Sequence, residues 1–109
     1  MSNADVSRSK MLAFQTQDAE LARSLLADDY TFTSPQDDHL DAAQWFEKCF
    51  PTADHFAGHE LTDVVESGDT VLLRYEYALD DGTRWANAER HVIRDGKIAE
   101  VQVYFGGQL

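Results

Sequence analysis

Residues 85–93 read Trp-Ala-Asn-Ala-Glu-Arg-His-Val-Ile, and the faces that these side chains take decide the fold of the chain. Side chains alternate between two faces along a strand, so the stretch predicts a strand with Asn87, Glu89 and His91 on one face. The stretches 70–79 and 97–105 alternate in the same way, and their odd-numbered positions are mostly apolar. We therefore expect polar side chains in an apolar wall, which marks a candidate site because buried polar groups are costly unless they are partnered.

The length of the turn at residues 80–82 decides which face Glu89 takes. A two-residue turn at Asp81-Gly82 would set Arg74 opposite Glu89, as an exposed salt bridge of little worth. A three-residue loop with Gly82 in the left-handed conformation keeps the apolar residues of both strands on one face, and register follows the hydrophobic pattern. We predict this second register, with the pairs Tyr77–Trp85, Tyr75–Asn87, Leu73–Glu89 and Val71–His91. A three-residue loop at 95–97 would then pair His91 with Val101 and Glu89 with Val103.

The remaining chain predicts helices before strands. Apolar residues at helical spacing indicate helices over 6–17, with Met11, Leu12 and Phe14 on the apolar side, and over 19–27. A strand at 30–34 ends at Pro35, a polar loop covers 36–39, and a helix with one apolar stripe extends to Phe50. Strands follow at 56–65, 70–79, 85–93 and 97–105. This order predicts an α+β fold in one domain over residues 1–109, with residues 1–5 outside it because Ser2-Asn3-Ala4 matches a cloning remnant.

Composition excludes several classes of function. Twenty acidic against nine basic residues give a net charge of −11, which repels nucleic acid and anionic membrane surfaces. No stretch has the ~20 apolar residues of a membrane helix, and the start lacks the layout of a signal peptide. The lone Cys49 suits a reducing compartment, so we expect a cytoplasmic protein. We expect no cofactor and no metal site, since His55 and His59 are too far apart along a strand to share an ion.

The chain resembles the nuclear transport factor 2-like superfamily, and within it the SnoaL-like and ketosteroid-isomerase-like proteins. The resemblance lies in the segments 25–29, Leu-Leu-Ala-Asp-Asp, and 34–35, Ser-Pro, before an amphipathic helix. It continues in 67–71, Ser-Gly-Asp-Thr-Val, in 95–98, Asp-Gly-Lys-Ile, and in 103–106, Val-Tyr-Phe-Gly. It implies a cone-shaped, curved antiparallel sheet wrapped around helices, a cystatin-like arrangement with a pocket at the wide end. It also implies a homodimer through the outer face of the sheet.

The resemblance carries over only in part to the catalytic positions of ketosteroid isomerases. Ser34 stands where those enzymes have an Asp base before a Pro, and Lys10 falls near their oxyanion-hole Tyr. Glu89 matches their second oxyanion donor, an acid kept protonated. One role of three is retained, which argues against a steroid isomerase and leaves room for a related reaction.

These observations predict a site on the concave face of the sheet. Glu89, whose pKa we expect burial to raise, and His91 are the predicted acid/base pair, with Asp38 or His39 of the polar loop as an added group. The predicted substrate-binding residues are Tyr30, Phe32, Ser34, Tyr75, Trp85, Asn87, Val101, Val103 and Phe105. The expected ligand is a small, mostly apolar metabolite. The expected function is an isomerase, cyclase or dehydratase, with a non-catalytic binding or dimerisation module as the alternative, in which the same polar residues form a satisfied buried network.

Overall fold

The computed structural model describes residues 1–109 as a mixed α+β fold. The helices are α1 (Asn3–Thr16), α2 (Ala19–Leu25) and α3 (Ala42–Lys48), with a 3₁₀ helix η1 (Phe50–His55). The strands are β1 (Leu26–Ser34), β2 (Asp37–Leu40), β3 (Phe56–Ser67), β4 (Thr70–Leu79), β5 (Arg84–Arg94) and β6 (Lys97–Gln108). No helix is both long and apolar enough to cross a membrane.

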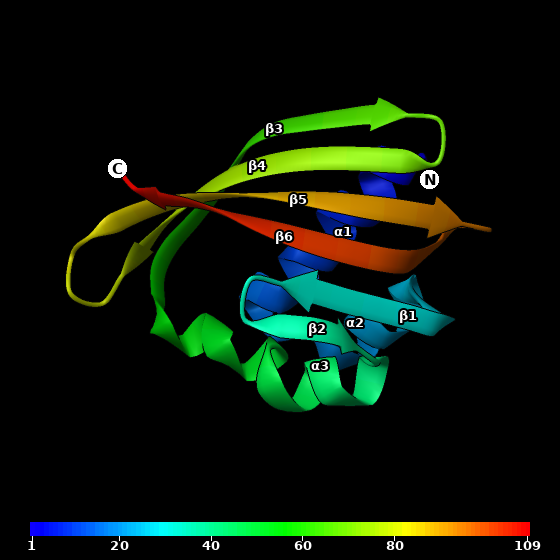
Figure 1. Ribbon diagram of the computed structural model, residues 1–109, viewed down its shortest axis with the longest axis horizontal. Helices are drawn as coiled ribbons and strands as arrows, with labels where there is room; N and C mark the ends of the chain where they lie inside the picture. Colours follow the sequence, from blue (N-terminus) through cyan, green and yellow to red (C-terminus); the bar gives the residue numbers. More distant parts are fainter.

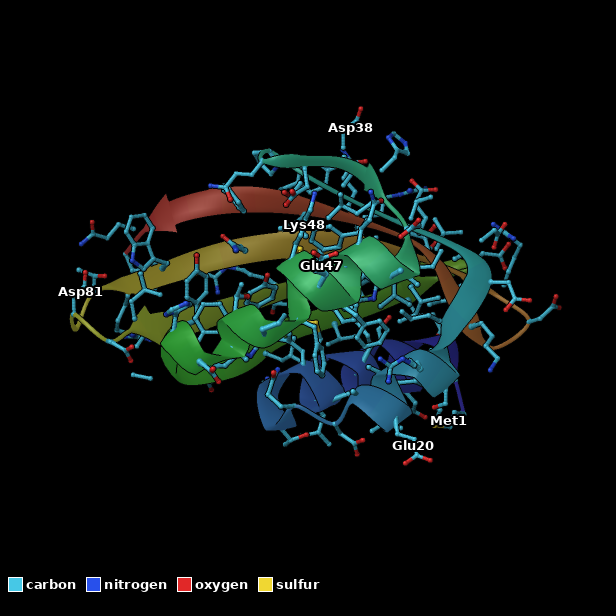
Figure 2. All side chains as sticks on the ribbon, turned by 90° about the horizontal axis from the view of Figure 1, so that it is seen from below. Met1, Glu20, Asp38, Glu47, Lys48 and Asp81 are labelled. Carbon is cyan, nitrogen blue, oxygen red and sulfur yellow. The ribbon has the colours of Figure 1, made fainter.

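All strands belong to one six-stranded sheet in the order β2-β1-β6-β5-β4-β3, and every neighbouring pair is antiparallel except β1 with β6. The sheet curves, and the helices lie on its concave side, with α1 running behind β4, β5 and β6 (Figure 1). Seen from below, α3 and η1 cover the space between the sheet and α1 (Figure 2). The predicted curved sheet wrapped around helices is thus confirmed.

The register between β4 and β5 is the predicted one. Tyr75 pairs with Asn87, Leu73 with Glu89 and Val71 with His91. The turn is the three-residue loop, in which Gly82 has a φ of 87° and donates its N–H to the Leu79 carbonyl. A residue with a side chain would be strained at that φ, so Gly82 helps to fix which residues of β5 face the core.

The turn between β5 and β6 differs from the prediction. Arg94 pairs with Lys97, so Asp95 and Gly96 form a two-residue turn in which both residues have positive φ, 52° and 74°. This turn type matches the twist of a hairpin, and the predicted three-residue loop is wrong. The register shifts between Val92 and Ile93, where Ala99 is an extra residue, a β-bulge. The extra residue in the bulge makes up for the shorter turn. The predicted pairs His91–Val101 and Glu89–Val103 are therefore confirmed, although a bulge and not a longer loop produces them.

Several boundaries at the N-terminal side also differ. Helix α1 starts at Asn3, because the Ser2 hydroxyl accepts the N–H of Asp5 while the Asp5 carboxylate accepts the N–H of Ser2. Residues 3–5 are therefore helical, and the expectation that they lie outside the fold is wrong. Leu12, expected on the apolar side, is 55% exposed.

The predicted loop 36–39 contains a short strand instead. Asp37–Leu40 pairs with the end of β1, with Leu40 opposite Phe32. β1 itself starts at Leu26, so it takes in the end of the predicted helix 19–27 and begins before the predicted strand 30–34. The third helix ends at Lys48 rather than Phe50, and the chain continues as η1 with Pro51 in its first turn.

The core lies between the concave face of the sheet and the helices. Trp45 of α3 is 2% exposed, and its ring packs against Tyr30, Phe46 and Phe50 with centroid distances of 4.9–5.9 Å. Burial of such rings is a main contribution to stability, since each removes roughly 150–250 Å² from water. The aromatic cluster closes one end of the core and leaves the other end of the concave face open.

Candidate functional site

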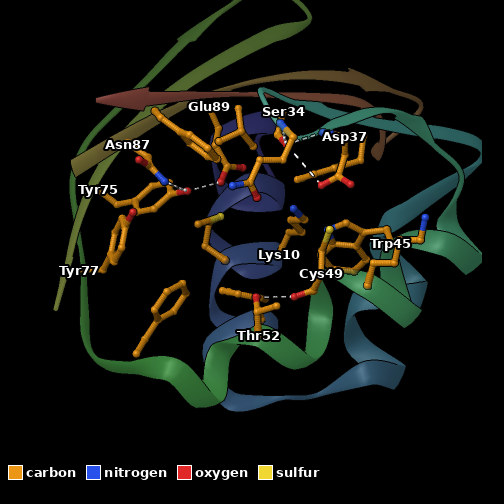
Figure 3. Close-up of a pocket in the computed structure, with 18 residues that line it drawn as sticks. Lys10, Ser34, Asp37, Trp45, Cys49, Thr52, Tyr75, Tyr77, Asn87 and Glu89 are labelled. Atoms are coloured by element: carbon orange, nitrogen blue, oxygen red, sulfur yellow. Dashed lines mark hydrogen bonds between the residues drawn. The ribbon is translucent and has the colours of Figure 1, made fainter. Parts of the chain in front are cut away.

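A cavity of about 290 Å³ lies between the concave face of the sheet, α1 and the α3–η1 segment (Figure 3). Eighteen residues line it, ten of them hydrophobic. A second cavity of about 320 Å³ adjoins it toward the open end and shares Gln36, Phe56, Tyr77, Asn87 and Phe105 with it. We call these the inner cavity and the mouth. Concave sites that combine an apolar majority with polar and charged groups are typical of small-molecule sites.

Glu89 of β5 is the central polar group of the inner cavity. Its side chain is 6% exposed, and both of its carboxylate oxygens accept hydrogen bonds. The Tyr75 hydroxyl donates to Oε2 over 2.7 Å, and His91 Nε2 lies 2.9 Å from Oε1. All three side chains share a face because β4 and β5 pair in the register described above.

The network extends beyond Glu89 in both directions. Ser7 of α1 lies 2.8 Å from His91 Nδ1, which links the first helix to the sheet. On the other side, the Asn87 amide donates to the Tyr75 hydroxyl over 3.4 Å, and the Gly106 N–H donates to Asn87 Oδ1 over 3.4 Å. The buried polar side chains from Ser7 to Asn87 are therefore partnered by one another, and Figure 3 shows the part formed by Tyr75, Asn87 and Glu89. The buried hydroxyl of Tyr30 has no hydrogen-bond partner.

The environment of Glu89 keeps its carboxylate ionised. Burial raises its pKa, but the positive charge of Lys10 and the hydrogen bonds from His91 and Tyr75 outweigh burial and lower the pKa to about 2. The raised pKa expected from the sequence is thus wrong. The expectation accounted for desolvation alone, and a carboxylate that accepts several hydrogen bonds beside a cation favours its charged form.

His91 acts behind the cavity wall rather than in it. Its side chain is 0% exposed, and it is absent from the lining of either cavity. Burial lowers its pKa despite the opposing effect of Glu89, so the ring is neutral. Because the Glu89 carboxylate only accepts, His91 Nε2 carries the proton and Nδ1 accepts from the Ser7 hydroxyl. His91 therefore orients Glu89 and does not reach a ligand.

Lys10 of α1, which the family resemblance places near the oxyanion-hole Tyr of ketosteroid isomerases, is the cation of the site. The residue is 3% exposed, yet it lines the inner cavity. Its Nζ lies 4.6 Å from the centroid of the Trp45 ring and 5.9 Å from that of Phe32. Burial lowers its pKa, while the negative charge of Glu89 opposes that shift. Such rings attract a cation, but they leave its N–H donors unused.

Polar groups from the β1–β2 hairpin form the opposite wall. The Ser34 hydroxyl accepts the N–H of Asp37 over 3.2 Å and donates to the Asp37 carboxylate over 3.4 Å. Cys49 is half-buried nearby, where burial and the charge of Asp37 raise the pKa of its thiol to about 11. This thiol is protonated at neutral pH and is a poor nucleophile. No group of three or more His, Cys, Asp or Glu side chains is arranged to hold a metal ion.

The structure brings most of the predicted site residues together. The inner cavity is lined by Phe32, Ser34, Tyr75, Asn87, Glu89, Val103 and Phe105, and the mouth by Trp85. Tyr30 and Val101 are buried behind the wall at 1% and 0% exposure. They support the cavity from the core side and do not line it.

Asp38 and His39 lie outside the site. Their side chains are 90% and 71% exposed and contact each other, and Figure 2 shows Asp38 projecting away from the body of the molecule. The positive φ of His39, 49°, breaks the alternation of the short strand β2. Asp37, one residue earlier, is the acidic group that faces the cavity from this hairpin.

Sequence reasoning also missed lining residues from the helices. These are Met11 and Phe14 of α1, Trp45 and Lys48 of α3, and Cys49, Thr52 and Phe56 beyond it. For α1 a signal was present, since Ser7 and Lys10 fall at helical spacing with Val6, Met11 and Phe14. Two polar residues on the buried stripe of a helix indicate that this face of the helix packs against other polar side chains or a polar cavity.

The model of the SnoaL-like domain matches residues 9–101 of this chain. The chain belongs to the SnoaL-like domain family. Its fold is that of the nuclear transport factor 2-like superfamily, as the sequence resemblance implied. No curated protein matches the sequence.

Solved structures show how widely this SnoaL-like fold is shared. A protein of unknown function with a cystatin-like fold from Xanthomonas campestris is 25% identical, with 99% of this chain and 93% of that chain covered and a TM-score of 0.83. A nuclear transport factor 2-like protein of unknown function from Cytophaga hutchinsonii is 21% identical, with 96% and 90% covered and a TM-score of 0.76. A de novo designed protein with a curved β-sheet is 17% identical, with 96% and 88% covered and a TM-score of 0.84. A fold that can be designed without a natural ancestor does not identify a function, which must be argued from the site.

Proposed function

We propose that this SnoaL-like protein is an acid/base enzyme of the isomerase, cyclase or dehydratase type that acts on a small, mostly apolar carbonyl compound. The observation that carries the proposal is the ammonium group of Lys10, which lies in a mostly apolar cavity and makes no hydrogen bond or ion pair with the protein. Hydrogen-bond donors without a partner in a dry site are available to a ligand, and a carbonyl oxygen supplies the missing acceptor.

Proton transfer in this proposal falls to Asp37 rather than to Glu89. Glu89 has a pKa of about 2, and both of its oxygens already accept hydrogen bonds, so it is a weak base. Its charge instead holds the cation of Lys10 in the cavity. Asp37 lines the cavity from the hairpin, and its only side-chain donor is the Ser34 hydroxyl at 3.4 Å. A carboxylate in this position can take a proton from the carbon next to a carbonyl group.

Deuterium exchange tests this proposal without knowledge of the natural substrate. Small aromatic ketones, with benzylacetone as the first probe, are incubated with the protein in D₂O, and exchange next to the carbonyl is followed by NMR. We expect catalysed exchange that Asp37→Asn slows by about 10²–10⁴-fold. Asp38→Asn is the matched control, because Asp38 is the exposed neighbouring carboxylate and its loss should leave the exchange rate unchanged. Exchange at the wild-type rate in Asp37→Asn would contradict the role of Asp37.

One observation favours a second function, that of a non-catalytic binding module. The polar groups of the sheet wall, from Ser7 through His91, Glu89 and Tyr75 to Asn87, are already partnered by one another. A binding module predicts that the ketone probes shift cavity resonances in NMR while wild-type protein catalyses no exchange. Such a result would replace the enzyme proposal with this one.

We also propose that the protein forms a homodimer through the outer face of the sheet. Val65, Leu72 and Tyr104 point outward from this face and are 59%, 50% and 50% exposed. Apolar side chains exposed together on one face of a sheet are typical of an interface. Light scattering should give twice the mass of the chain for the wild type and the monomer mass for Leu72→Arg. The equally exposed Leu12 of α1 supplies the control, since Leu12→Arg should remain dimeric.

A further inference from the structure

The surroundings of Lys10 make release of its proton easier than it is for an exposed lysine. The side chain is 3% exposed and lies between the aromatic rings of Phe32 and Trp45. No carboxylate comes within ion-pair distance of Nζ, because the two oxygens of Glu89 are held by Tyr75 and His91. The nearest charge therefore attracts Lys10 through space without solvating it. An amine in such a place loses little when it releases its proton.

The charged and titratable groups around Lys10 act in opposite directions. Burial lowers the pKa of Lys10, whereas the charges of Glu89 and Cys49 raise it, and the net shift is downward. Cys49 itself is a neutral thiol at physiological pH, so its opposing effect is absent there. A lysine with a lowered pKa carries a fraction of free amine at neutral pH, and the free amine is a nucleophile toward carbonyl carbon.

We propose that Lys10 is a covalent catalyst, which forms an imine with the carbonyl carbon of an aldehyde or ketone bound in the inner cavity. This inference rests on the proposed function and names how the carbonyl group is activated. It gives Lys10 a different task from that of an oxyanion hydrogen-bond donor, since the amine bonds to carbon and not only to oxygen.

The reaction balances with the residues that line the cavity and one molecule of water. The lone pair of Nζ forms a C–N bond, the carbonyl π electrons move to oxygen, and a proton passes from nitrogen to that oxygen to give a carbinolamine. The carbinolamine hydroxyl takes a further proton from solvent and leaves as water, which gives an iminium ion, and the final hydrolysis returns that proton to solvent. The iminium ion withdraws electrons from the neighbouring C–H bond, and the Asp37 carboxylate takes that proton to leave an enamine. Return of the proton to a different carbon of a conjugated substrate shifts the double bond. Water then hydrolyses the iminium ion and regenerates both the carbonyl group and Lys10.

The other two lysines of the chain are natural internal controls. Lys48 is exposed at the rim of the inner cavity, and Lys97 donates its Nζ protons to the Ser24 carbonyl at the surface. Neither is enclosed by aromatic rings. Any general reactivity of protein amines with a carbonyl probe will therefore appear at Lys48 and Lys97 as well as at Lys10.

Reductive trapping in the wild-type protein tests the inference. The protein is mixed with benzylacetone and sodium cyanoborohydride at neutral pH, where the reagent reduces an iminium ion to a stable secondary amine, and the lysine peptides are analysed by mass spectrometry. We expect Lys10 to be modified at least about tenfold faster than Lys48 or Lys97, because the cavity holds the ketone beside its Nζ and so raises the effective concentration of the carbonyl group there. Modification of Lys10 no faster than that of the other two would overturn the inference.

The variants Lys10→Arg and Lys97→Arg separate this inference from the function on which it rests. Arginine keeps the positive charge but cannot form the imine, so we expect Lys10→Arg to lose deuterium exchange and Lys97→Arg, outside both cavities, to retain it. Exchange by the wild type without trapping at Lys10 would overturn the covalent step and leave the acid/base function standing. Exchange that survives in Lys10→Arg would do the same. Absence of both trapping and exchange would overturn both proposals.

Discussion

The chain contains two pairs in which a carboxylate and an imidazole lie close together in sequence, and one pair is buried while the other is exposed. Glu89 and His91 lie in the sheet wall with side chains that are 6% and 0% exposed, whereas Asp38 and His39 lie on β2 at 90% and 71%. Both pairs were predicted from the sequence to take part in catalysis. The residue types are nearly the same, and only the buried pair belongs to the site.

The difference shows that the surroundings of a pair decide its chemistry. The exposed pair interacts in a high dielectric and exchanges partners with water, so its interaction contributes little. In the buried pair, every proton is fixed by a partner, with Tyr75 on one oxygen of Glu89 and Ser7 beyond His91. Four experiments break or sharpen this comparison.

Removal of the buried carboxylate should have the largest effect. Glu89→Ala leaves the donors of Tyr75 and His91 without an acceptor and the charge of Lys10 without a counter-ion. We expect a loss of about 3–5 kcal/mol in the free energy of unfolding, as for other broken buried pairs. Asp38→Ala should stay within about 0.5 kcal/mol. Urea unfolding followed by circular dichroism measures both, and equal losses in the two variants would contradict the comparison.

Acid should weaken the fold through Glu89. Its folded-state pKa of about 2 lies below the ordinary value of 4.5, so its stabilising contribution is complete above about pH 4.5 and is lost as pH falls toward 2. The difference corresponds to about 3 kcal/mol, since one pKa unit is about 1.4 kcal/mol. Urea midpoints measured across that pH range should fall for the wild type and vary less for Glu89→Gln, whose amide cannot titrate. Parallel curves for the two proteins would show that other groups govern acid unfolding.

Loss of one hydrogen bond to the buried carboxylate should have an intermediate effect. Tyr75→Phe removes the 2.7 Å bond to Glu89, and hydrogen bonds to charged groups contribute roughly 1.5–3 kcal/mol. Tyr77 lines the same cavity and makes no side-chain hydrogen bond, so Tyr77→Phe is the matched control and should cost less. Thermal unfolding of both variants measures the two losses of stability. A larger loss of stability in Tyr77→Phe than in Tyr75→Phe would contradict the prediction.

The exposed imidazole should be the least sensitive position. His39→Ala removes a ring that is 71% exposed and contacts only Asp38, so we expect a change within about 0.5 kcal/mol and no change in ketone exchange. His91→Ala should lower stability and perturb the resonances of Glu89 and Tyr75. A strong loss of deuterium exchange in His39→Ala, with the fold intact, would show that the exposed pair takes part in the reaction.

The sequence was informative where one periodicity controlled many side chains. Alternation in β4 and β5 fixes Tyr75, Asn87 and Glu89 on the concave face, because a slip of one residue would expose the whole apolar set. It was less informative for single residues in short elements. Asp37 and Asp38 are adjacent acids, and only the folded hairpin shows that Asp37 is the one that lines the cavity.

The pKa values of buried charged residues were the other property that local sequence patterns did not predict. The pKa of Glu89 depends on Lys10, which lies 79 positions earlier in the chain and meets the sheet only in the folded protein. The helical spacing of Ser7 and Lys10 with the apolar residues of α1 predicts a buried polar stripe. It does not predict which strand the stripe will meet, because that depends on how α1 packs.

The extra residue at Ala99 has a consequence for how this gene can change. Because Ala99 is unpaired between Ile98 and Glu100, loss of its codon would leave a regular hairpin with the same pairs, and Val101 and Val103 would keep facing inward. Loss of one codon at 102 would instead turn either Val101 or Val103 to the opposite side. We therefore expect descendants of the gene to tolerate loss of the bulge residue alone, whereas a deletion at 102 would need a second indel nearby.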